Sequence, residues 1–227
     1  KAWLALGTLG MAGVGTALWA RPHIWNPCLP PALAQSPQLA TLLAAAWSGL
    51  DPAQLWDGHV HLAGTGDSGG GISISADMLS LAHPVQYTQR LFYLNAGCTR
   101  DGEVDASFVE SMLASLDAFP PGAKALLLAF DHAHDMDGTP RPEASAFYVP
   151  NEYAAAVVAQ RPDRLAWACS VHPARADAVE ALDAAVAAGA CAVKWLPPAM
   201  GIDPGDARCD RFYAALARHD LPLICHA

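Results

Sequence analysis

The fold class is clearest in residues 165–196, LAWACSVHPARADAVEALDAAVAAGACAVKWL. This segment contains two apolar strand-like runs with one helix between them. The runs are Leu165 to Val171 and Ala190 to Leu196. A helix is expected over Ala176 to Ala188, and Gly189 is placed to end it. Strands that are apolar throughout and alternate with helices are typical of parallel sheets, which are buried on both faces. The segment therefore predicts a strand-helix-strand unit of a parallel α/β sheet.

The same rhythm extends to both sides of this segment. Apolar runs near Leu55 to His61 and Ala125 to Phe130 precede it, and Leu221 to His226 follows it after a further helical pattern. Five strands that alternate with helices are typical of a (β/α) barrel of the TIM type. Residues 55–227 fall short of the roughly 250 residues of a typical closed barrel. We therefore expect a barrel that is truncated after its fifth strand, preceded by an N-terminal hydrophobic helix.

The chain divides into three predicted parts. Residues 1–20 form an apolar segment, residues 21–50 a proline-rich linker with a short helix, and residues 51–227 the partial barrel. An insertion at about 63–122 follows the first strand; it opens with a glycine-rich loop and includes a helical pattern over Ala76 to Ala96. An insertion at this place either covers an active site or decorates the surface.

The apolar segment has three possible interpretations. Ala2 to Ala20 contains no charged residue, and at a helical rise of 1.5 Å per residue it spans about 28 Å, close to the thickness of a bilayer core. It is a membrane anchor, a cleaved secretory signal with Ala32-Leu33-Ala34 as the cleavage site, or a buried core helix. The first two interpretations place the rest of the chain outside the cytoplasm, in the periplasm of a bacterium.

Composition excludes several classes of protein. Of 227 residues, 53% are hydrophobic and only 15% are charged, which excludes a disordered or fibrous chain. The formal net charge is -9, and the sequence has no run of Lys and Arg that could follow a phosphate backbone. Nucleic-acid binding is therefore disfavoured, and a membrane contact is expected through the N-terminal segment. The sequence does not indicate an oligomeric state.

The sharpest chemical feature is Asp57-Gly58-His59-Val60-His61 in the first predicted strand. Residues two apart in a strand point to the same face, so His59 and His61 can present both imidazoles to one ion. Two neutral imidazoles suit zinc or a similar transition metal. The pair alone is weak support, because polar residues are also common at strand ends.

The later predicted strands also end in residues whose side chains can bind a ligand or take part in a reaction. In parallel strand-helix sheets ligands bind at the carboxyl ends of the strands, so these residues should converge on one side. In chain order the residues are His132 and His134, His172, Lys194, and His226.

The sequence resembles the amidohydrolase superfamily of metal-dependent TIM barrels, in particular its amidohydrolase-related branch. The motifs WDGHVHL, CSVHP, AVKWLPP and LPLICHA carry the resemblance at the first, third, fourth and fifth strands. It implies that His59, His61 and His226 are the metal ligands, for one or two divalent ions with zinc preferred. It also implies an aspartate at the end of the eighth strand, which these 227 residues do not reach.

The resemblance gives two further residues candidate catalytic roles. Lys194 occupies the position where binuclear members of the superfamily carry a carboxylated lysine that bridges two metals; the alternative is an inward lysine paired with a carboxylate. His172 precedes a proline, and it either faces the site or caps a loop. The second pair, His132 and His134, is either a ligand set for a second metal or part of a loop that contacts substrate.

Four functions are compatible with these observations. The first is a metal-dependent hydrolase in which a metal-activated water attacks an amide, ester, lactone or related bond. The second is a metal-dependent decarboxylase or hydratase of the same branch. The third is a catalytically incomplete module attached to a membrane. The fourth is a periplasmic metal-storage or sensing protein, although the regular series of strand ends counts against it.

Overall fold

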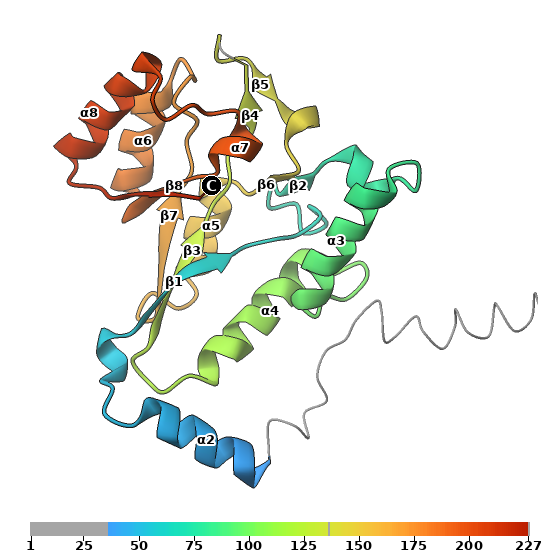
Figure 1. The fold of residues 1–227 in the computed structure, drawn as a ribbon, viewed down its shortest axis with the longest axis vertical. Helices are drawn as coiled ribbons and strands as arrows, with labels where there is room; N and C mark the ends of the chain where they lie inside the picture. The colour runs from blue at the N-terminus through green and yellow to red at the C-terminus, as the bar shows by residue number, and fades with distance from the viewer. Residues whose placement is uncertain (1–35, 136, 227) are drawn as a thin grey trace, which may run out of the picture.

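The computed structural model describes residues 36–135 and 137–226. Their centre is a five-stranded, entirely parallel sheet that curls into a half-barrel (Figure 1). The strand order follows the order along the chain, as in a (β/α) barrel. All five predicted strands are confirmed with shorter ends: β1 (Trp56–His61), β3 (Lys124–Leu128), β7 (Leu165–Cys169), β8 (Ala192–Trp195) and β9 (Leu223–Cys225).

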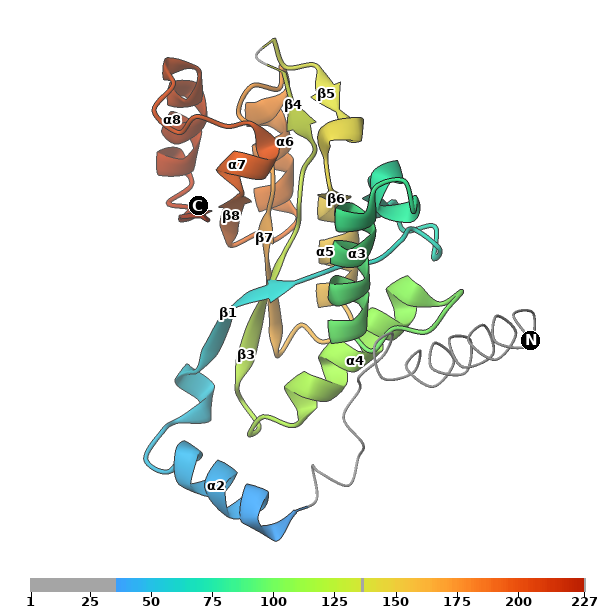
Figure 2. The ribbon, with the colours of Figure 1, turned by 45° about the vertical axis from the view of Figure 1, so that its right-hand side comes forward.

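The two faces of the sheet pack differently. The convex face carries Leu127, Trp167 and Trp195 into a large apolar cluster with the helices that connect the strands. Those helices are α5 (Asn151–Val158), α6 (Ala178–Ala187) and α8 (Asp210–Arg218), and Figure 2 shows α5 and α6 beside β7. The concave face carries a small cluster, Leu126, Leu128, Ala168 and Ala192. Because successive side chains of a strand alternate, Lys194 shares the concave face with Ala192.

The strand-helix-strand unit matches its prediction closely. Helix α6 ends next to Gly189, whose φ of +94° is in the left-handed region that glycine adopts without strain. The amide of Ala190 then donates to the carbonyl oxygen of Ala185 at 3.0 Å, which satisfies a carbonyl at the end of the helix. Leu182 is fully buried on the inner side of α6, and burial of such a side chain contributes about 2 kcal/mol.

The insertion is less regular than predicted. A single helix over Ala76 to Ala96 is wrong, because the segment forms a 3₁₀ turn η3 (Ala76–Leu79) and a separate helix α3 (Pro84–Ala96). Pro84 lacks an N–H group and disfavours a helical conformation of the residue before it, so the helix begins anew there. The remaining elements are α2 (Pro37–Trp47), η2 (Pro52–Gln54), β2 (Ser73–Ile74), α4 (Val104–Asp117), β4 (Ala133–His134), β5 (Pro140–Arg141), η4 (Pro142–Ala144), β6 (Phe147–Tyr148), α7 (Pro197–Met200) and η5 (Ala207–Cys209).

A buried carboxylate holds the glycine-rich loop that follows β1. Asp105, in the first turn of α4, is fully buried and accepts hydrogen bonds from the amides of Thr65, Gly66 and Ser68 and from the Ser68 hydroxyl. Gly64 has no room for a side chain, since an added Cβ would lie 2.1 Å from the Asp105 carboxylate. The start of the insertion is therefore fixed to α4.

The predicted membrane anchor, signal segment and proline-rich linker fall on residues 1–35, which lie outside the described residues. Among the residues that the structure describes, no helix is both long enough and apolar enough to cross a bilayer. Helix α2 confirms the predicted short helix before the barrel.

Candidate active site

His59 and His61 lie on β1 at the concave face of the sheet. The pairing of β1 with β3 shifts register between Asp57 and Val60, and the amide of His59 donates to the Asp57 carboxylate at 3.1 Å. Val60 points the other way and packs against the large apolar cluster. The predicted alternation of this strand is therefore confirmed: one face has the two imidazoles and the other has the apolar side chain.

The two imidazoles contact each other directly. The Nε2 atoms of His59 and His61 are 2.9 Å apart, which is hydrogen-bond distance. One ring therefore donates a proton and the other accepts it, so the neutral pair holds a single proton at the point where both rings aim. A cation bound at this point would replace that proton.

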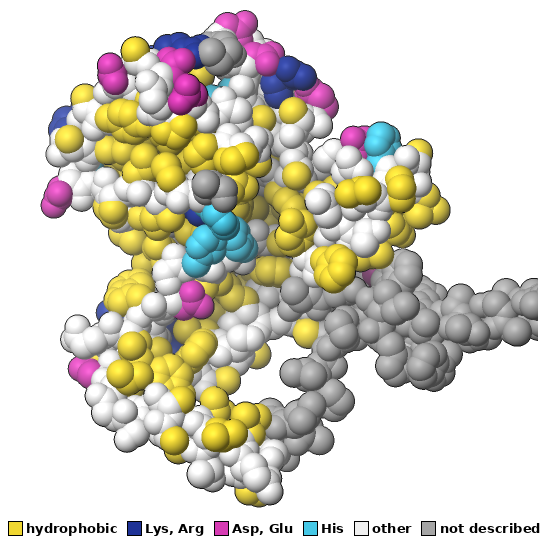
Figure 3. Space-filling model, in the orientation of Figure 1, with side chains coloured by type: hydrophobic (Ala, Val, Ile, Leu, Met, Phe, Trp, Pro, Cys, Tyr) yellow, Lys and Arg dark blue, Asp and Glu magenta, His cyan; other side chains and the backbone are white. Residues whose placement is uncertain are grey.

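His226 extends the pair to a group of three rings. Its ring centroid lies 5.3 Å from that of His59, with the ring planes at 88°. The amide of His226 donates to the carbonyl oxygen of Trp195 at 3.2 Å, so hydrogen bonding to the end of β8 positions it. Figure 3 shows a compact group of histidine side chains on one face of the molecule. His59, His61 and His226 each keep part of their surface exposed to solvent.

Lys194 is the buried residue of the site. It is fully buried on β8, and its Nζ has no hydrogen-bond partner among the described residues. The predicted alternative, a pairing with a carboxylate, is therefore not seen in this part of the chain. Burial lowers the pKa of Lys194, because the charged ammonium loses its hydration there.

The charges of the site favour neutral imidazoles. Loss of hydration, followed by the neighbouring His59, Lys194 and His226, lowers the pKa of His61 to about 4. The same loss, followed by Lys194 and His226, lowers the pKa of His59, and Asp57 only partly opposes this. Neutral imidazole is the form that binds a metal, so both rings are in the required state at pH 7.

The three imidazoles are suitable metal ligands by chemical type, but their positions do not form a complete metal site. Three imidazoles lie together, and nitrogen donors suit zinc-like ions. Within residues 36–135 and 137–226, however, no group of three or more His, Cys, Asp or Glu side chains is arranged to hold an ion. The ligand assignment of His59, His61 and His226 therefore remains a prediction.

His172 lies in a different environment from these three rings. Its side chain is buried, its Nε2 donates to the carbonyl oxygen of Met200 at 3.0 Å, and its Nδ1 accepts from the amide of Ala174 at 3.2 Å. Both nitrogens thus bind backbone groups, an arrangement that favours the loop-capping alternative over a catalytic one. Burial, with the charge of His134, lowers the pKa of His172 to about 4.

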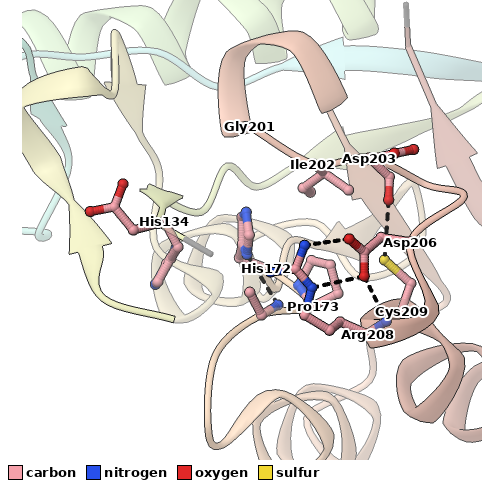
Figure 4. Close-up of a pocket in the computed structure, with 11 residues that line it drawn as sticks. His134, His172, Pro173, Gly201, Ile202, Asp203, Asp206, Arg208 and Cys209 are labelled. Atoms are coloured by element: carbon pink, nitrogen blue, oxygen red, sulfur yellow. Dashed lines mark hydrogen bonds and ion pairs between the residues drawn. The ribbon is translucent and has the colours of Figure 1, made fainter. Parts of the chain in front are cut away.

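The second histidine pair is divided between two environments. The His132 ring stacks on Tyr148 at a centroid distance of 3.9 Å, whereas the His134 ring lies 4.7 Å from that of His172. His134 and His172 line a cavity of about 20 Å³ beside Asp206 and Arg208 (Figure 4). A cavity of this size holds about one water molecule and no organic substrate.

Two groups outside the predicted site residues organise the strand ends. Asp131 is buried just after β3, where it accepts from the amide of His172 at 2.8 Å and pairs with the Arg175 guanidinium at 3.0 Å. Phe130 stacks on His61 with ring centroids 5.2 Å apart and planes at 9°. Asp131 precedes the HAH sequence and was visible as a strand-end residue, but no sequence signal marks the stacking of Phe130.

The geometry defines the class of the protein: a parallel α/β half-barrel with nitrogen-rich side chains gathered at the carboxyl ends of its strands. The chain belongs to the amidohydrolase family, whose model matches residues 56–227. Among curated proteins no relative matches it.

Several solved structures resemble part of the chain. One of them is a probable 2-pyrone-4,6-dicarboxylic acid hydrolase of Acinetobacter baumannii with citric acid bound, 16% identical, with a TM-score of 0.46. The match covers 76% of this chain and 49% of that one, so this chain spans about half the length of the hydrolase.

Proposed function

We propose that this chain carries the metal-binding half of a metal-dependent hydrolase that cleaves an amide, ester, lactone or related bond of a small molecule. Membership of the amidohydrolase family supports the hydrolytic class. The observation that supports the metal most directly is the contact of His59 with His61, whose Nε2 atoms converge to 2.9 Å with His226 adjacent.

The residues divide the work as follows. His59, His61 and His226 would hold the metal, which we propose to be one or two divalent ions, with zinc preferred. A divalent metal, when bound, lowers the pKa of its water to about 7 and polarises a carbonyl. The lowered pKa values of His59 and His61 keep their rings neutral, so that the two nitrogens are available as ligands over the physiological range.

Lys194 is the proposed catalytic residue. Its Nζ is buried on the concave face without a described partner, and it interacts electrostatically with both first-strand histidines. As an ammonium it would attract an anionic or carbonyl oxygen of the substrate; as a carboxylated lysine it would instead add an anionic ligand. Replacement by Arg keeps a positive charge but cannot be carboxylated, so Lys194→Arg separates these two roles.

An activity test addresses the hydrolytic proposal. The protein is assayed with zinc, manganese or cobalt against esters, amides and lactones, alongside His59→Ala and His226→Ala. His83→Ala is the matched control, since His83 is a half-exposed histidine paired with Asp77 in the insertion. The proposal requires metal-dependent turnover that both site variants lose and the control keeps. Turnover that survives chelation in all four proteins would contradict it.

We also propose that residues 1–20 anchor the chain to a membrane or direct its export, which would place the half-barrel outside the cytoplasm. The support is the uncharged run from Ala2 to Ala20. Cell fractionation followed by alkaline extraction tests it: an anchored chain stays in the pellet, an exported chain is released outside the cytoplasm, and a chain found only in the cytoplasmic fraction would contradict both.

A further inference from the structure

Phe130 has a backbone held in place from both sides. It follows β3, and its amide donates to the carbonyl oxygen of Val149 at 3.0 Å, while the amide of Val149 donates back to the Phe130 carbonyl oxygen at 2.9 Å. These two bonds form a bridge between the end of the sheet and the segment that follows β6. The position of the Phe130 Cα is therefore fixed by hydrogen bonds that do not depend on its side chain.

The Phe130 ring is also held by packing. It contacts both the large cluster and the small concave cluster, because it lies at the end of β3 where the two clusters approach each other. Its ring is nearly parallel to that of His61, with planes at 9° and centroids 5.2 Å apart. This is the separation and orientation of an offset aromatic stack.

His61 is thus confined by two neighbours. Phe130 stacks against its ring, and His59 meets the edge that carries Nε2. A phenyl ring offers no hydrogen-bond acceptor, so it orients the imidazole without competing for either nitrogen. His59 has no such stack in the described residues; its ring contacts are with His61 and His226.

We infer that Phe130 is the positioning residue for His61: its stacked ring fixes the orientation in which Nε2 meets His59. This inference rests on the proposed metal site for its functional consequence. Groups that orient a metal-binding histidine typically change metal affinity by about 10- to 100-fold when they are removed. A stacked ring has no hydrogen bond to lose, so we expect the lower end of that range, about tenfold.

The experiment compares three substitutions of Phe130 with one matched control. Phe130→Ala removes the ring, Phe130→Leu keeps apolar volume without a flat face, and Phe130→Tyr keeps the ring. Phe92→Ala is the control, because Phe92 is 73% exposed on α3. The first measurement is the NOE between the ring protons of His59 and His61 in the metal-free protein, assigned with His61→Gln; the second is the dissociation constant for zinc.

The inference requires the NOE between the two imidazoles, which depends on the orientation of the His61 ring, to weaken in the Ala and Leu variants and to persist in the Tyr variant and in the control. Zinc affinity should fall about tenfold in the Ala and Leu variants and less than twofold in the other two. An unchanged NOE between His59 and His61 in Phe130→Leu would overturn the inference, as would zinc affinity in that variant equal to wild type. If wild type binds no zinc, the proposed function fails, and the NOE still decides whether Phe130 orients His61. Should Phe130→Ala not fold, the comparison of Leu with Tyr suffices.

Discussion

Acid should destabilise this fold through His172 in a way that can be measured apart from other groups. The side chain is 3% exposed, and both of its ring nitrogens bind backbone groups in the neutral form with the proton on Nε2. A second proton would go on Nδ1, where the amide of Ala174 already donates. Charging His172 therefore costs one hydrogen bond in addition to the loss of hydration.

The direction and the size of this pH effect on the free energy of unfolding follow from the pKa values of His172 in the unfolded and folded states. An unfolded histidine titrates near 6.5, and the folded His172 titrates at about 4. Between these values the unfolded chain binds more protons, so the free energy of unfolding falls as the pH falls. The contribution is complete above pH 6.5 and is lost on the way to pH 4. A difference of about 2.5 units, at 1.36 kcal/mol each, corresponds to about 3 kcal/mol.

Urea unfolding at pH 7, 6, 5 and 4.5 of wild type and His172→Gln tests this prediction. The variant removes the titrating group, so other histidines and carboxylates cancel in the difference between the two proteins. At pH 7 the variant should be the less stable protein, because a buried amide loses its acceptor. The gap should narrow steadily towards pH 4.5, by about 2 to 3 kcal/mol. Parallel curves for the two proteins would refute the assignment of a low pKa to His172.

Two further stability predictions use matched controls. Gly64→Ala places a Cβ against the Asp105 carboxylate and should lower the free energy of unfolding by about 1 to 3 kcal/mol. Gly58→Ala, in strand β1, meets no described atom within 4 Å and should leave the free energy of unfolding unchanged or raise it by less than about 1 kcal/mol. Equal urea midpoints of the two variants would contradict this. Asp131→Asn removes the buried carboxylate charge that pairs with Arg175, although Arg175 keeps its ion pair with Asp177, and should cost about 1 to 3 kcal/mol. Glu110→Gln alters a pair with Arg100 in which both side chains are exposed, and it should leave the thermal midpoint nearly unchanged. An equal effect of both substitutions would count against a structural role for Asp131.

The strand-helix rhythm was readable from the sequence because each strand buries both faces. Leu127 and Leu128 are fully buried on opposite faces of β3, and such continuous apolar runs leave little ambiguity. The insertion is harder to predict, because its short strand β2 pairs with a segment far away in the sequence: Ser73 and Ile74 pair with Tyr148 and Phe147. No local periodicity encodes such a pairing.

The sequence predicts which histidines come together in the site, but it does not predict the surroundings of the other residues. Alternation along β1 places His59 and His61 on one face, and the topology brings His226 to them. The environment of His172 was not predictable, because it depends on a contact with Met200 that lies 28 residues away. The stacking of Phe130 on His61 likewise depends on how β1 and β3 align in space. The local sequence does not encode that alignment.

Metal titration of the chelator-treated protein examines the proposed metal site itself. Calorimetry with zinc should show binding by wild type and by His83→Ala, with one or two ions per chain. His59→Ala/His61→Ala should weaken binding by at least about 100-fold, because it removes two of the three proposed ligands. Full retention of zinc by the double variant, or no zinc binding by a folded wild-type protein, would contradict the account.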